Sequence, residues 1–224
     1  MVTALIGVEE PLRGIRKVAA KRLTQAWQAP SFPLIIDVDM NALLSQHVSG
    51  SGITVTDRLL QLVARALIEH PGVNAHFQDD VITRFETVNL GLAVGTPQGL
   101  TVPVIHGVEK LTVDQISERR RDLVERARVG ALQMADIDGG TFSVSNLGMM
   151  GIRQFTSILN PPQVAILAVG ASQRRVVEAG SGLAVRPMST LTLTCDHRAL
   201  DGVMGAEFLA TLKTLIETNR DAGN

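Results

Sequence analysis

The stretch that decides the fold is Leu191-Thr192-Leu193-Thr194-Cys195-Asp196-His197-Arg198-Ala199-Leu200-Asp201-Gly202. An apolar segment, interpreted as a strand over residues 183–195, ends at Cys195, and a long helix is predicted from Asp201 to Thr218. Chain segments that join regular elements are where folds commonly present reactive groups. The stretch therefore indicates a candidate site at a junction between a strand and the final helix.

His197 is the candidate for chemistry at this junction, since a neutral imidazole can accept a proton near pH 7. The alternative is a structural histidine satisfied by its neighbours, and spacing alone does not decide between the two. Asp201 suits a helix N-cap, which is worth about 1 kcal/mol relative to alanine. A cap and a role at the site are compatible with each other.

Working outward, the pattern predicts a layered mixture of helices and strands. Residues 1–11 form an N-terminal arm, and residues 12–224 form one domain of α/β or α+β class. Apolar spacing predicts helices over 12–29, 56–70, 112–129 and 201–218, and strands over 34–40, 88–95, 100–105, 141–145, 163–170, 174–179 and 183–195. Thr96-Pro97-Gln98-Gly99 suits a tight turn, and the Arg-rich face of 112–129 is interpreted as solvated.

Composition excludes several classes of function. The 224 residues carry a formal net charge of -1, which gives no global field to hold nucleic acid or an anionic membrane. Cys195 is the single cysteine, so an internal disulfide is impossible, and no Cys/His cluster has zinc spacing. No apolar run reaches the roughly 20 residues of a membrane-spanning helix. We expect no metal, no membrane and a reducing compartment.

His197, Asp201 and Gly202 also form the HxxxDG motif that chloramphenicol acetyltransferases share with the acyltransferase cores of 2-oxo acid dehydrogenase complexes. The chain resembles the dihydrolipoyl acyltransferases of those complexes over nearly its whole length. The other segments that carry the resemblance are residues 12–23, 90–105, 139–148 and 160–167. This resemblance implies a chloramphenicol acetyltransferase-like mixed sheet with flanking helices.

The resemblance also implies roles for individual residues. The reaction would move an acyl group, acetyl in the first instance, between a dihydrolipoyl thiol and coenzyme A. A thiol with a pKa of about 8.5 is mostly protonated at neutral pH, so a base is required, and His197 takes that role. Ser145 would stabilise the tetrahedral oxyanion, with Ser143 ranked below it. An ion pair between Asp201 and Arg16 of the first helix would hold the motif.

Further expectations concern substrates and partners. Coenzyme A is a substrate, and lipoyl-lysine sits on a separate domain that nothing in these residues resembles. The resemblance implies a homotrimer with active sites at subunit interfaces, and partners that include the lipoyl domain and the dehydrogenase subunits. The polar ending at residues 217–224 puts a larger cage in doubt. A bacterial cytoplasm is favoured over a mitochondrial matrix.

Two other functions stay open at this point. One is a free-standing acetyltransferase that uses His197 on a small acceptor. The other is a catalytically silent homologue that only scaffolds a complex. Retention of Ser145, His197 and Asp201 argues against the silent scaffold.

Overall fold

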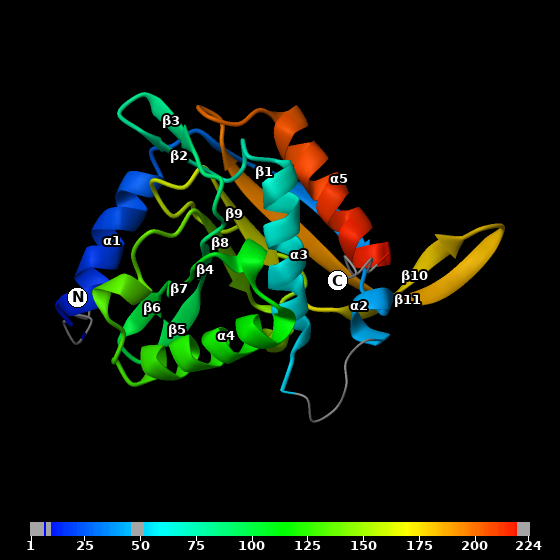
Figure 1. Cartoon of the computed structure of the whole chain (residues 1–224), viewed down its shortest axis with the longest axis horizontal. Helices are drawn as coiled ribbons and strands as arrows, with labels where there is room; N and C mark the ends of the chain where they lie inside the picture. The colour runs from blue at the N-terminus through cyan, green and yellow to red at the C-terminus, as the bar shows by residue number, and fades with distance from the viewer. Residues whose placement is uncertain (1–6, 8–9, 46–51, 219–224) are drawn as a thin grey trace, which may run out of the picture.

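The computed structural model describes residue 7 and residues 10–45 and 52–218. A mixed sheet runs through these residues in the order β1-β11-β9-β8-β4-β7, and β10 pairs with β11 as well (Figure 1). The β4–β8 and β8–β9 pairs are parallel and the other pairs are antiparallel. The strands of this sheet are β1 (Ser31–Asp39), β4 (Leu90–Leu92), β7 (Val104–Ile105), β8 (Phe142–Asn146), β9 (Ala165–Val169), β10 (Gln173–Ala179) and β11 (Gly182–Asp196). The expected mixed sheet is therefore confirmed.

Helices cover one face of this sheet, and the main apolar core lies between them and the strands. The core contains Phe142 of β8 and Phe208 of α5, whose rings lie 5.9 Å apart. α1 lies instead beside β6, away from α5 (Figure 1). The helices are α1 (Gly14–Ala26), α2 (Asn41–Ser45), α3 (Val55–Glu69), α4 (Val113–Arg128) and α5 (Gly202–Thr218), with 3-10 turns η1 (Val108–Lys110), η2 (Met134–Asp136) and η3 (Gly148–Met150).

Capping residues set where two of the helices begin. The Thr54 hydroxyl accepts the Asp57 N–H, and the Asp57 carboxylate accepts the Thr54 N–H at 2.7 Å, so α3 begins one residue earlier than predicted. Thr112 and Gln115 form the same reciprocal pair at the start of α4, which therefore begins one residue later than predicted.

Two small hairpins flank the main sheet. The turn at 96–99 is confirmed as the link between β5 (Val94–Thr96) and β6 (Gly99–Thr101). The hairpin of β2 (Ala75–Gln78) and β3 (Val81–Arg84) was not predicted. Its turn places Asp79 and Asp80 at φ 51° and 60°, in the left-handed conformation. Aspartate tolerates this conformation, but glycine in the same place would have predicted the turn more clearly.

The Arg-rich face of α4 is not wholly solvated, which corrects one prediction. Arg120 forms a bidentate ion pair with Asp57 of α3, whose carboxylate is fully buried. Burial by itself raises the pKa of Asp57, but hydrogen bonds from Arg120 and Thr54 lower it overall. Helix periodicity could not show this pairing, because it depends on how α3 and α4 pack.

The boundary of the N-terminal arm stays a prediction, since most of residues 1–11 lie outside the described residues. Gly7, Glu10 and Pro11, which are described, are exposed and belong to no helix or strand.

Candidate active site

His197 lies in the turn between β11 and α5, and contacts from the start of β1 hold it there. Its backbone N–H donates to the Pro30 carbonyl at 3.0 Å. Its ring packs against Phe32, with 4.6 Å between the ring centroids, and the residue is exposed. The imidazole is thus anchored on one side and accessible to a substrate.

Asp201 lies four residues further on, at the start of α5, where its carboxylate accepts the Met204 N–H at 2.8 Å. It acts as a helix N-cap. The expected ion pair with Arg16 is not formed within the chain: Arg16 contacts the Glu10 carboxylate at 3.4 Å and the Pro97 carbonyl at 3.5 Å. The physical reason is placement, because α1 lies beside β6 and α5 beside β1.

Replacing Asp201 with alanine is expected to lower the free energy of unfolding by about 1 kcal/mol, because α5 loses its N-cap. Asp201→Asn is the matched control, since asparagine caps equally well and should stay within a few tenths of a kcal/mol of wild type. Urea denaturation followed by circular dichroism measures both. Equal losses in the two variants would show that charge, not capping, is what Asp201 contributes.

Ser145 lies near the end of β8, half-buried, and within the described parts of the chain its hydroxyl has no hydrogen-bond partner. Ser143 differs, because its buried hydroxyl donates to the Gln163 side chain at 2.6 Å and accepts from Asn160 at 3.2 Å. A hydroxyl that is free to donate is what an oxyanion needs. Of the two serines, the structure leaves only Ser145 available for that task.

Ser145 and His197 do not meet within one chain. Ser145 pairs with Ala168 of β9, which pairs with Thr192 of β11, so two strand spacings separate Ser145 from β11. His197 follows Thr192 by a further five residues. Strand geometry then gives about 10 Å across the sheet and about 16 Å along it. One substrate atom cannot reach both side chains of a single copy, because hydrogen bonds span only about 3 Å.

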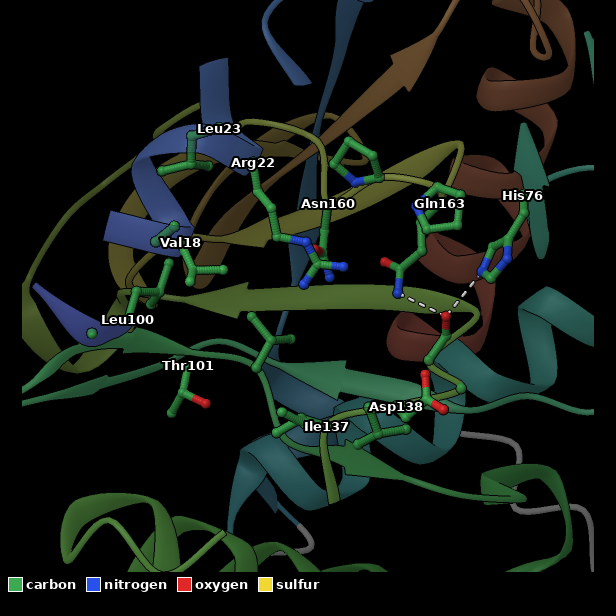
Figure 2. Close-up of a pocket in the computed structure, with 18 residues that line it drawn as sticks. Val18, Arg22, Leu23, His76, Leu100, Thr101, Ile137, Asp138, Asn160 and Gln163 are labelled. Carbon is green, nitrogen blue, oxygen red and sulfur yellow. Dashed lines mark hydrogen bonds between the residues drawn. The ribbon is translucent and has the colours of Figure 1, made fainter. Parts of the chain in front are cut away.

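A cavity of about 630 Å³ opens between α1 and the strand edge formed by β6 and β7 (Figure 2). Apolar side chains form most of its wall, and Arg22 points into it from α1. Asn160 and Gln163 belong to its lining and hold Ser143 from the same side. Ser143 and Ser145 are two residues apart on one strand face, so Ser145 lies about 7 Å along β8 from the serine that these two residues hold. The apolar lining residues are Val18, Ala19, Leu23, Leu100, Val102, Val104, Ile137, Pro161 and Pro162.

His76 closes one end of the cavity and was missed by sequence reasoning. Its Nε2 lies 2.9 Å from the Gly140 carbonyl, which also accepts a hydrogen bond from Gln163 at 3.0 Å (Figure 2). Burial lowers the pKa of His76, an effect that the bond to Gly140 offsets in part. A neutral His76 with its Nε2–H on Gly140 therefore supports the cavity wall without adding charge.

The described parts of the chain contain no group of three or more His, Cys, Asp or Glu side chains placed to hold a metal ion. Cys195 is buried, and burial raises the pKa of its thiol to about 12, so it is a poor nucleophile. None of the described helices is long and apolar enough to span a membrane.

Solved structures share this arrangement of strands and helices. The chain superposes on a probable dihydrolipoamide acetyltransferase from Listeria monocytogenes with a TM-score of 0.93 and 32% identity, covering 97% of each chain. It matches the Azotobacter vinelandii dihydrolipoamide acetyltransferase with a TM-score of 0.91 and 31% identity over 96% of this chain and 93% of that one. The same values hold for the cubic core of a pyruvate dehydrogenase multienzyme complex. A chloramphenicol acetyltransferase, at 16% identity and a TM-score of 0.59 over 88% and 94% of the two chains, shows the shared fold.

The fold and the exposed histidine after its long strand define an acyltransferase catalytic domain of the chloramphenicol acetyltransferase-like class. Residues 7–222 match the model of one family within it, described as 2-oxoacid dehydrogenases acyltransferase (catalytic domain). The chain belongs to this family.

Relatives with curated names agree with the family. The acetyltransferase component of the mitochondrial pyruvate dehydrogenase complex of Dictyostelium discoideum is 38% identical over 216 residues, which are 92% of this chain and 34% of that protein. Its counterpart from Rickettsia bellii is 36% identical over 218 residues, or 93% and 52% of the two chains. The chain thus spans about half, or less, of the length of these curated relatives.

Proposed function

We propose that this domain transfers an acetyl group between the thiol of a dihydrolipoyl arm and the thiol of coenzyme A. The observation that carries the proposal is the free Ser145 hydroxyl on one strand and the exposed His197 imidazole after another. In the Azotobacter vinelandii enzyme a serine, a histidine and an asparagine were investigated for catalysis, and they have the same sequence separations as Ser145, His197 and Asp201. Position for position, the two proteins differ in the third residue, asparagine there and aspartate here.

The chemistry follows from these side chains. His197 takes the proton of the attacking thiol, and the thiolate forms a bond to the thioester carbonyl carbon. The Ser145 hydroxyl donates a hydrogen bond to the resulting oxyanion. When the intermediate collapses, the carbon–sulfur bond to the leaving thiol breaks and His197 returns the proton to that sulfur. Asp201 helps by fixing the first turn of α5 beside the base.

We propose a trimer as the working unit, with Ser145 of one copy facing His197 of the next. The wide separation of the two side chains within one chain supports it. A second support is the row of Ser145, Ala168, Thr192 and Ile35 across the sheet: Ala168 and Thr192 are buried, and Ile35 at the end of the row is 53% exposed. Trp27 is 75% exposed at the end of α1, and exposed apolar side chains of this size are typical of interfaces.

We place the dihydrolipoyl arm in the cavity beside α1. Its apolar walls suit an uncharged aliphatic chain, and its lining residues Asn160 and Gln163 bond to Ser143, on the strand that also carries Ser145. The lipoyl domain and the dehydrogenase subunits are proposed as partners that the rest of a longer protein or separate chains would supply. The proposed location is a bacterial cytoplasm, with the mitochondrial matrix as the alternative that the Dictyostelium relative represents.

The experiment that tests the function is transfer of acetyl from acetyl coenzyme A to free dihydrolipoamide. We expect turnover with acetyl and weaker turnover with succinyl and branched donors. The preference should be modest, because each additional methylene changes the binding of the acyl group by about 1 to 3 kcal/mol. No turnover with any donor would reject the proposal in favour of a silent scaffold. Turnover with small acceptors but not with dihydrolipoamide would favour a free-standing acetyltransferase.

A further inference from the structure

The side chains on either side of His197 are joined to each other. Asp196, the last residue of β11, has a carboxylate that is almost fully buried. Its Oδ1 accepts the Arg198 backbone N–H at 3.1 Å and the guanidinium Nε at 2.9 Å, and its Oδ2 accepts Nη2 at 2.6 Å. We call this pair the 196–198 clip. The clip therefore fixes the turn on both sides of His197, whose imidazole takes no part in the pair and lies exposed against Phe32.

Both ends of the clip are anchored to the fold. The Asp196 N–H donates to the Val164 carbonyl at 2.8 Å, and the Asp196 carbonyl accepts the N–H groups of Ala199 and Leu200. The Arg198 guanidinium lies over the Phe77 ring, 4.4 Å from its centroid, so the β2–β3 hairpin supports it. A planar guanidinium can stack on a ring and bind a carboxylate in two places at once, which lysine cannot do.

We propose that Arg198 and Asp196 are positioning residues for His197: the clip aims the imidazole out of its own chain, toward the substrate thiol. The inference rests on the proposed function, because it takes His197 to be the base. It adds a reason for the exposed position of His197. If the imidazole of His197 pointed into its own chain, it could not act together with Ser145 of a neighbouring copy.

The test is the kinetics of Arg198→Met in the transfer assay with acetyl coenzyme A and dihydrolipoamide. We expect kcat to fall about 10²-fold with KM within about twofold, since misplacing a catalytic group by about 1 Å has that effect. Arg198→Lys should recover part of the loss, because it restores the charge but not the two-pronged contact. Asp196→Asn should lose as much as Arg198→Met, and the double variant no more than either, because the two act as one unit.

Arg126→Met is the matched control. Arg126 pairs with Asp122 and Asp136 on the side of α4, so its loss should lower the melting temperature and leave kcat unchanged. Should Arg198→Met fail to fold, Phe77→Leu removes only the supporting ring and is expected to lower kcat about threefold to tenfold. The inference is wrong if Arg198→Met resembles Arg126→Met, or if its loss lies in KM alone. A wild type without turnover would instead reject the function itself.

Discussion

Replacing His197 with alanine is expected to reduce kcat for acetyl transfer by about 10²- to 10⁴-fold, the range that a positioned general base contributes. The reason is the state of the thiol, which is mostly protonated at neutral pH and needs a base to become a nucleophile. Folding should be little affected, because the side chain is exposed and its fixed contacts are one ring packing and a backbone bond. Transfer kinetics and thermal melts on the same preparations measure both effects.

His70→Ala is the control for the loss of a histidine as such. His70 is half-buried at the end of α3, where its Nε2 lies 2.8 Å from the Thr211 hydroxyl and its ring meets Phe208 edge-on. The His70→Ala variant should have a lower melting temperature and an unchanged kcat. If His197→Ala instead retained kcat within about tenfold of wild type, the structural alternative for this histidine would be correct and the base would have to be sought elsewhere.

Local chemistry explains which parts of the fold the sequence could predict. The start of α4 was placed within one residue from apolar spacing, and Thr112 and Gln115 carry a local capping signal there. The β2–β3 hairpin was missed because its turn uses two aspartates in a left-handed conformation, where glycine would have been a clear signal. The ion pair of Arg120 with Asp57 joins two helices, so no pattern within one helix could reveal it.

The candidate site also has parts that the sequence could predict and parts that it could not. The turn that carries His197 is continuous in sequence, so the junction of strand and helix singled out this histidine, and the resemblance supplied its role. The cavity was not foreseen, because its wall comes from α1, the β6–β7 region and two loops that only folding brings together. The pairing of Arg16 with Asp201 was expected from resemblance alone and is absent within the chain, where each residue has another contact. Distance along the sheet, not the motif, is what supports the proposal that two copies share a site.

Mixing two inactive variants provides the largest expected gain of activity. Ser145→Ala and His197→Ala should each be reduced by about 10²-fold or more. Co-assembled in equal amounts, they should recover about a quarter of wild-type activity, since in a cyclic trimer with head-to-tail contacts about one interface in four combines an intact Ser145 with an intact His197. The transfer assay uses the whole co-assembled population, and two different tags on the two chains confirm that mixed trimers have formed.

The matched control uses the double variant Ser145→Ala/His197→Ala mixed with an equal amount of wild type. If each chain carried its own complete site, this mixture would keep about half of the wild-type activity, and the mixture of single variants would recover none. If each site is shared, both mixtures converge on about a quarter, because either way only one interface in four is intact. The two mixtures therefore differ in activity if each chain carries its own site and agree if each site is shared. The described strand register, which separates Ser145 from His197 by about 16 Å along the sheet, predicts that they agree.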